Sequence, residues 1–240
     1  LFDHGLVDAI LAPRALAATA ARLLDILAES DSATAPEVEV PELADRSEAE
    51  EAWYSVCRTR DPHRPGIRAL LRLGASQSLP LFGTGAGEFD RSIILALARF
   101  GDQPCVVLGQ DRRGEMAEQP LGPQGLRVAR RGMRLARELD LPLVSVIDTS
   151  GAALSQQAEE SGLAGEIARC LSDLIALEVP TLCVLLGQGT GGGALALLPA
   201  DRVIAAEHSW LSPLPPEGAS EILHRTPERA AELAAQQQGR

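Results

Sequence analysis

Two consecutive buried strands, each followed by a loop of small residues, limit the folds open to this 240-residue chain. The apolar runs "LVSVID" and "TLCVLL" have the length and composition of buried strands. The loops "DTSGA" (148–152) and "GTGGGA" (189–194) follow them, and a helical pattern comes after each loop. Repeated units of this kind predict an α/β fold whose strands are buried and largely parallel.

The rest of the pattern places further elements around these units. Two runs, 92–100 and 103–111, predict strands joined by a hairpin at Gly101 and Asp102. We expect helices over 125–140 and 159–176, a short helix from 191, a strand over 201–207, and proline-initiated helices from 215 and 226. Towards the N-terminus we expect a turn and helix over 1–28, an acidic linker over 29–51, and a helix over 53–73 interrupted at "DPHRPG".

The stretch "LLGQGTGGGALAL" allows three interpretations of its glycines. Gly187, Gly189 and Gly192 fit the spacing G-x-G-x-x-G, and Glu207 follows about twenty residues later, as in a dinucleotide-binding turn. Pro199 leaves only a short helix after them, which disfavours a bound dinucleotide. Glycines in both loops instead permit close approach to a ligand, whose developing negative charge the loop N–H groups can stabilise. The third interpretation is that both loops are only tight turns.

Charge and composition disfavour several other classes of function. The formal net charge of −11 argues against binding to nucleic acid. No apolar run reaches the roughly 18 residues that span a bilayer, and no secretory signal is visible, so we expect no membrane partner. The four cysteines form no C-x-x-C pair and the four histidines lack metal-ligand spacing. We therefore expect reduced thiols, no bound metal and a cytoplasmic location.

One predicted helix carries a stripe of positive charge. Its arginines recur at positions i, i+3, i+4 and i+7, which places them on one face: Arg127, Arg130, Arg131 and Arg134. This face either meets phosphates or an acidic carrier, or it is a solvated surface whose charges pair with neighbouring glutamates.

An ordered set of motifs resembles one enzyme family. The elements "IDT-GA", "AEE-G--GEIAR-L", "VP", "G-G--GGALAL", "ADRV" and "PEGA--IL" occur in this order over residues 142–223. They resemble the α part of bacterial acetyl-CoA carboxylase carboxyltransferase, and the resemblance continues more loosely upstream to about Glu50. The opening "LFDHGLVDAIL" resembles the C-terminal end of the β part. This implies a fused chain lacking most of its β part, with that end at 1–28, a linker at 29–50 and the α part at 51–240.

The resemblance implies a crotonase-like (ClpP/crotonase) fold, an α/β superhelix of β-β-α turns. It implies an enzyme that transfers a carboxyl group from carboxybiotin to acetyl-CoA, which yields malonyl-CoA for fatty-acid synthesis. The biotin belongs to a separate biotin carboxyl carrier protein, and no tightly bound cofactor is expected in this chain. The implied partners are the β part, which binds the acyl-CoA, and the carrier protein, within an oligomer.

The same resemblance assigns roles to individual residues of the glycine loops. Gly193 and Ala194 correspond to an oxyanion pair, and Gly192 permits the backbone to approach the ligand. Gly151 and Ala152 form the neighbouring loop. These five positions are the expected catalytic site, which acts through backbone donors rather than through an acidic side chain.

Four further positions are expected to bind substrate, and the sequence departs from the family near some of them. They are Gly191, Ser150, Arg112 and Arg113, with the two arginines in place of a lysine-rich segment. Ser150 stands at a usual proline, "ALSQQ" (153–157) replaces a Tyr-Pro-Gly continuation, and Gln188 replaces an acidic residue. These departures concern substrate choice and catalysis more than the fold.

Two other function classes stay open. One is a hydratase or isomerase of acyl-CoA on the same fold, which would need a carboxylate beside the glycine loops, with Asp148 and Glu159 as candidates. The other is a noncatalytic domain that docks a carrier. A serine hydrolase built on Ser150 is disfavoured because the motif G-x-S-x-G is absent.

Overall fold

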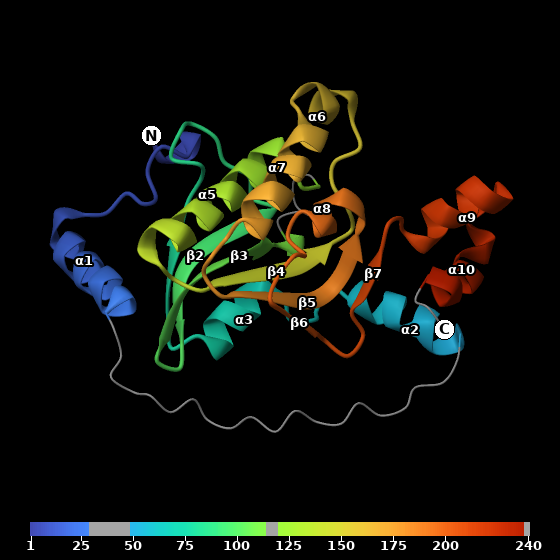
Figure 1. The fold of residues 1–240 in the computed structure, drawn as a ribbon, viewed down its shortest axis with the longest axis horizontal. Coiled ribbons are helices and arrows are strands. Elements are labelled where there is room, and N and C mark those ends of the chain that lie inside the picture. The colour runs from blue at the N-terminus through green and yellow to red at the C-terminus, as the bar shows by residue number, and fades with distance from the viewer. Residues whose placement is uncertain (29–48, 114–119, 238–240) are drawn as a thin grey trace.

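A computed structural model describes residues 1–28, 49–113 and 120–237 of the chain. Its described strands form one seven-stranded sheet in the order β1-β2-β3-β4-β5-β6, with β7 also paired to β5 (Figure 1). The strands are β1 (Gln77–Leu81), β2 (Ile93–Phe100), β3 (Gln103–Gln110), β4 (Leu143–Thr149), β5 (Thr181–Thr190), β6 (Arg202–Ala205) and β7 (Trp210–Ser212). Pairs β1–β2 and β2–β3 are antiparallel and the remaining pairs are parallel, which confirms the predicted hairpin and the parallel strands.

Helices cover both faces of the sheet (Figure 1). The helices are α1 (Pro13–Leu27), α2 (Ala49–Thr59), α3 (Ile67–Gly74), α5 (Pro123–Leu139), α6 (Gln156–Glu160), α7 (Leu163–Ile175), α8 (Gly191–Leu195), α9 (Pro216–His224) and α10 (Ala230–Gln237), with short 3₁₀ turns at Phe2–His4 and Pro227–Arg229. Alternate residues of β3 belong to two cores: Val106 and Leu108 pack with α5, whereas Cys105 and Val107 pack with Ile67 of α3. A strand buried on both faces reads as a continuous apolar run, as the sequence does here.

Several elements differ from the sequence prediction. The helix predicted over 159–176 is divided into α6 and α7 at Gly162, whose φ of +87° is a left-handed conformation that interrupts a helix. The strand predicted to end at 186 continues to Thr190. Strand β1 was not predicted at all. Most of the predicted linker, 29–48, lies outside the described residues, while positions 49 and 50 belong to α2.

The segment 1–28 packs onto the same sheet as the rest of the chain. Ile26 of α1 is fully buried within the main core. The guanidinium of Arg99, on β2, donates to the carbonyl oxygens of Asp25, Ile26 and Ala28 at 2.6–2.9 Å, and so satisfies the carbonyl end of α1. Helix α1 and strand β2 therefore share one core.

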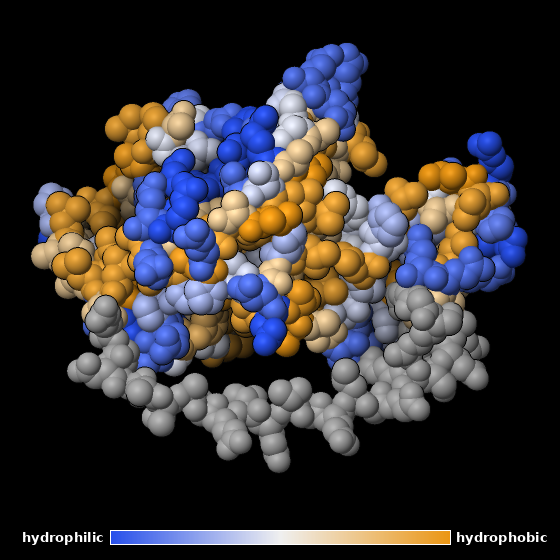
Figure 2. Space-filling view, viewed as in Figure 1, coloured by the Kyte–Doolittle hydropathy of each residue, from blue (hydrophilic) through white to orange (hydrophobic). Residues whose placement is uncertain are grey.

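The arginine stripe of α5 is neutralised by carboxylates from other elements. Arg127 binds Glu88 at 2.8 Å, Arg130 binds Asp173 at 2.6 Å, and Arg131 binds Asp8 at 2.8 Å, the last tying the N-terminal segment to α5. Burial would raise the pKa of Glu166, but hydrogen bonds from Arg169, Arg127 and Arg130 outweigh it and lower that pKa. These partners are mostly tertiary, unlike the local glutamates that the helical spacing indicated. Figure 2 shows the resulting hydrophilic band across this face.

None of the helices in the described ranges is both long and apolar enough to cross a membrane.

We predict that Arg99→Ala lowers the free energy of unfolding by about 1–3 kcal/mol, because it leaves the buried carbonyl of Ile26 and the partly buried carbonyls of Asp25 and Ala28 without these donors. The exposed Arg14 of α1 supplies the control, since Arg14→Ala removes the same charge without removing such bonds. Urea denaturation measures both variants. Equal stabilities of the two would contradict the role assigned to Arg99.

Candidate active site

The two glycine loops meet at the carboxyl ends of β4 and β5. A side-chain carbon added at Gly193 would lie 3.0 Å from the backbone nitrogen of Ala152 and 3.4 Å from the carbonyl carbon of Gly151. Gly151 has a φ of +130°, a conformation that favours glycine. The structure therefore brings together Gly193, Gly151 and Ala152 as the sequence predicted.

Helix α8 presents its first turn at this meeting point. It begins after Thr190, whose side chain makes no capping bond, and it contains the five residues from Gly191 to Leu195. The first N–H groups of a helix have no partners within the helix. Gly193 and Ala194 are buried, and an added carbon at Gly192 would meet Ile167 of α7 at 2.8 Å. Small residues here let α8 pack closely against both α7 and the 151–152 loop.

Gly187 and Gly189 lie within β5, so the G-x-G-x-x-G spacing does not form a phosphate-binding turn. A side-chain carbon at Gly187 would lie 1.9 Å from the guanidinium of Arg64 and 2.4 Å from the carboxylate of Asp148. At Gly189 it would lie 2.8 Å from the side chain of Leu211. These glycines make room for tertiary neighbours rather than for a cofactor.

A buried ion pair fills the space that Gly187 leaves. Arg64, from the loop between α2 and α3, donates to the carboxylate of Asp148 at the end of β4. Only 1% of the Asp148 side chain is exposed, and burial raises the pKa of this carboxyl group against the opposing effect of Arg64. Asp148 is therefore a structural carboxylate, as predicted, and not a base exposed to ligand.

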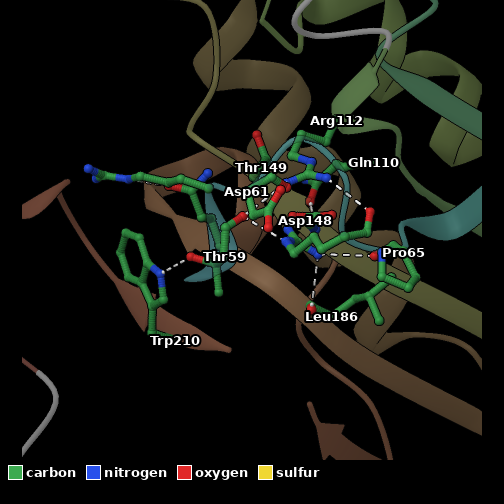
Figure 3. A network of polar contacts seen from close by, with 12 residues as sticks. Thr59, Asp61, Pro65, Gln110, Arg112, Asp148, Thr149, Leu186 and Trp210 are labelled. Carbon is green, nitrogen blue, oxygen red and sulfur yellow. Dashed lines mark hydrogen bonds and ion pairs between the residues drawn. The ribbon is translucent and has the colours of Figure 1, made fainter. Parts of the chain in front are cut away.

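Arg112 is buried and binds the backbone of the same loop (Figure 3). Its guanidinium donates to the carbonyl oxygens of Thr59, Asp61 and Arg64 at 2.7–3.2 Å. Burial, and then repulsion from Arg64, lower the pKa of Arg112. This side chain holds the loop in place. The predicted substrate role would require a side chain exposed to solvent, and Arg112 is buried.

The other predicted substrate positions are more accessible. Ser150 and Arg113 are exposed, and Gly191 is partly buried with a φ of +61°. Arg113 lines a small cavity of about 40 Å³ together with Arg64, Arg68, Arg72 and Arg112. The structure thus places Ser150 and Gly191 at the glycine loops but Arg112 and Arg113 beside the Arg64 loop.

Sequence reasoning missed the residue that connects these parts. Gln110, the last residue of β3, is fully buried. Its amide nitrogen Nε2 donates to the carbonyl oxygen of Gly193 at 2.6 Å, and its Oε1 accepts from the backbone N–H of Asp148 at 3.0 Å. A single glutamine at the end of a strand has no sequence pattern that distinguishes it.

Gln188, a position where the sequence resemblance implied an acidic residue, joins a contact between three elements. Its Oε1 accepts from Nε of Arg60 at 3.2 Å, and Arg60 also forms an ion pair with Glu217 of α9 at 2.5 Å. The pKa of Glu217 is lowered, chiefly by its hydrogen bond from Arg60. Glu217 already supplies the negative charge that balances Arg60, so a neutral hydrogen-bond acceptor at position 188 is enough to complete this contact.

Burial disfavours reactive thiols at three of the four cysteines, whereas Cys57 is exposed. Cys105, Cys170 and Cys183 are buried, and burial raises the pKa of the Cys105 and Cys170 thiols to about 12. Within the described ranges, no group of three or more histidine, cysteine or carboxylate side chains is arranged to hold a metal ion.

Comparison with known proteins identifies relatives for most of the chain. Residues 38–238 match the family described as "Acetyl co-enzyme A carboxylase carboxyltransferase-like". A "Probable biotin-dependent acyl-coenzyme A carboxylase beta3 subunit" of Mycobacterium tuberculosis is 52% identical over 235 residues, which is 98% of this chain and 46% of that protein. An "Acetyl-coenzyme A carboxylase carboxyl transferase subunit alpha" of Francisella philomiragia is 36% identical over 75% of this chain and 59% of that protein. The chain thus spans about half the length of these curated relatives.

Solved structures share the fold at low sequence identity. Transcarboxylase 12S has a TM-score of 0.68 and 19% identity, and the similarity covers 91% of this chain and 43% of that one. The beta subunit of geranyl-CoA carboxylase from P. aeruginosa has a TM-score of 0.61 and 21% identity, covering 83% of this chain and 40% of the other. These neighbours confirm the crotonase-like fold expected from the sequence.

Two buried threonines beside the site should respond to substitution with opposite signs. The hydroxyl of Thr190 has no hydrogen-bond partner among the described residues, so we expect Thr190→Val to raise the free energy of unfolding by about 1 kcal/mol. The hydroxyl of Thr59 accepts from Nε1 of Trp210 at 2.9 Å and donates to the carbonyl of Val56 at 2.8 Å. Thr59→Val should therefore lower the free energy of unfolding by about 1–3 kcal/mol.

Thermal melting of both variants measures this difference. The two substitutions exchange the same atoms at similarly buried sites, so each serves as the control for the other. Destabilisation of similar size in both would show that the Thr190 hydroxyl is satisfied in the folded protein.

Proposed function

The chain belongs to the acetyl co-enzyme A carboxylase carboxyltransferase-like family, and we propose that it forms the α part of a biotin-dependent acyl-CoA carboxyltransferase. The observation that carries this proposal is the contact of Gly193 with the Gly151–Ala152 loop, at the meeting of two strand ends. We propose acetyl-CoA as the acyl acceptor, malonyl-CoA as the product and fatty-acid synthesis as the use of that product. The names of the relatives support the wider class of acyl-CoA carboxylases.

The proposed catalytic groups are backbone donors. The first turn of α8 supplies N–H groups at Gly193 and Ala194, and the close contact with Ala152 leaves no space for larger side chains. Such preorganised donors stabilise an oxyanion that develops in the transition state. In this role they hold the negative charge of an enolate, or of the group that releases the carboxyl, while Ser150 and Gly191 contact the substrate.

The cofactor that fits this arrangement is biotin carried on a separate protein. When bound, biotin supplies the carboxyl group that is transferred. The packing of Gly193 against the backbone of Ala152 places small residues and no charged side chain at this point, which suits a group recognised through backbone N–H donors. Gly192, Gly193 and Ala194 are the residues that would face it. The partner that delivers it is then a biotin carboxyl carrier protein.

The sheet edge formed by β6 and β7 is the proposed contact with the β part. Both strands pair with β5, one after the other along its length. Val203 and Ile204 of β6 are 52% and 56% exposed, and Leu211 of β7 is 41% exposed. An apolar edge strand of this kind requires cover by a partner. We propose that the β part covers this edge within an oligomer.

We also propose a domain organisation for the chain. Residues 1–28 are the end of a fused β part, 29–50 are a linker, and 51–240 are the α part.

The arginine-lined cavity near Arg113 is the proposed contact with the phosphates of coenzyme A. Arg113 is exposed, and 60% of the Arg68 side chain is exposed. The carboxylate of Asp111 neutralises Arg68, with 2.8 Å between Oδ2 of Asp111 and Nε of Arg68. Arg112 supports this cavity by holding the loop that carries Arg64. We place the protein in the cytoplasm because its four cysteines are unpaired.

No observation favours the two alternative functions. A hydratase or isomerase needs a carboxylate poised at the glycine loops, whereas the carboxylate of Asp148 is paired with Arg64. A noncatalytic docking domain would share the packing of Gly193 against Ala152, so the transfer assay below separates it from the proposed function.

The first test is carboxyl transfer by separated and combined parts. We expect the 240-residue chain alone to be inactive with a biotin derivative and several acyl-CoAs, and activity to appear when the β part is added. The reason is that the acyl-CoA site of this family lies mainly in the β part. Efficient turnover by the chain alone, or no turnover by the combined parts, would contradict the proposal.

The second test addresses the backbone donors. In the active assembly, Gly193→Val should reduce the transfer rate about a hundred- to thousandfold, because its side chain displaces Ala152 and misaligns the N–H groups. Thr190→Val should cost much less, since its hydroxyl has no assigned role. Circular dichroism and thermal melting check that both variants fold. A nearly normal rate for Gly193→Val, together with loss of activity in Thr190→Val, would assign the role to the threonine.

A further inference from the structure

We propose that Gln110 is a positioning residue that sets the distance between the two glycine loops, and this rests on the function proposed for those loops. Its carboxamide forms a hydrogen bond with each of the two loops. The donor end holds the carbonyl oxygen of Gly193 in α8, and the acceptor end holds the N–H of Asp148 at the start of the other loop. One planar amide thus fixes two backbone positions that belong to different strand–loop–helix units.

The burial of Gln110 makes these two bonds costly to lose. The side chain is fully buried, so water cannot replace either bond. A buried amide that uses both its donor and its acceptor also has one preferred orientation, because a flip would place its NH₂ against the N–H of Asp148. The bridge is therefore rigid, as a group that positions catalytic donors has to be.

The bridge acts on the carbonyl side of the peptide that supplies a proposed oxyanion donor. The carbonyl of Gly193 and the N–H of Ala194 belong to one planar peptide unit. A hydrogen bond at 2.6 Å to this carbonyl fixes the direction of that N–H. The bond also polarises the peptide, which strengthens the N–H as a donor. Gln110 thus acts on the substrate through Ala194 without touching it.

The surroundings of Gln110 contain further charged groups that matter for any test with pH. Asp148 and Arg64 form the buried pair beside its acceptor end, and Asp111 and Arg112 follow it in the chain. Asp111 is paired with Arg68 and Arg112 is bonded to carbonyl groups. Each neighbour is present in wild-type protein and variants alike, so a comparison at each pH isolates the group at 110.

The experiment substitutes Gln110→Glu, which changes one NH₂ into an oxygen of similar size. A neutral carboxyl group donates to Gly193 and accepts from Asp148 as the amide does, whereas a carboxylate cannot donate. Carboxyl transfer by the complete assembly should therefore show a kcat reduced about a hundredfold at high pH, a KM within about twofold of wild type, and recovery relative to wild type as the pH falls. Gln103→Glu, the same change at the exposed end of β3, is the control and should follow the wild-type profile.

A second measurement keeps the proposal testable whatever the chain catalyses. At high pH, amide hydrogen exchange in both 146–152 and 188–196 should be faster in Gln110→Glu than in wild type at the same pH, and in neither loop should Gln103→Glu differ from wild type. Failure of the wild-type assembly to transfer carboxyl groups would refute the proposed function and leave this measurement intact. Faster exchange in one loop only, or a Gln110→Glu rate that follows the wild-type pH profile, would overturn the proposed bridge.

Discussion

The buried ion pair between Arg64 and Asp148 is the interaction on which the arrangement of the site depends. It joins the loop between α2 and α3 to the carboxyl end of β4, and it exists because Gly187 of β5 has no side chain to exclude it. Arg112 secures the same loop by three bonds to its carbonyl groups (Figure 3). A buried pair of this kind is expensive to break, since either partner alone leaves an uncompensated charge. The ends of β3, β4 and β5 are consequently held in one geometry.

The sequence was most informative where burial imposed a pattern. Strands β2 to β5 were predicted because both faces of the sheet are covered there, which makes most of their residues apolar. The contact between the loops was predicted because small residues recur after two such strands. Strand β1 escaped prediction because it is a partly exposed strand containing Pro80 at the edge of the sheet. Its extended backbone is determined by pairing with β2 and not by local composition.

Features that depend on distant partners could not be predicted. Glycine usually interrupts a strand, so β5 was expected to end before Gly187. The strand continues because Gln188–Thr190 pair with β7, and Gly187 leaves room for the distant Arg64. The charges of α5 were visible, but their partners lie on segments as distant as Asp8. Gln110 had no pattern at all. Each of these assignments requires knowledge of which residues the fold brings together.

The ion pair also decides whether an oxyanion can be stabilised next to Asp148. This residue opens the 148–152 loop, and an unpaired carboxylate there would repel the negative charge that the donors of α8 are proposed to hold. Arg64 neutralises that carboxylate, and Arg112 adds a positive charge nearby whose pKa is lowered by burial and by repulsion from Arg64. Gln110, the side chain in direct contact with both loops, is neutral. Because Asp148 is compensated, the backbone dipoles of α8 and the positive charge of Arg112 are what a developing oxyanion meets there.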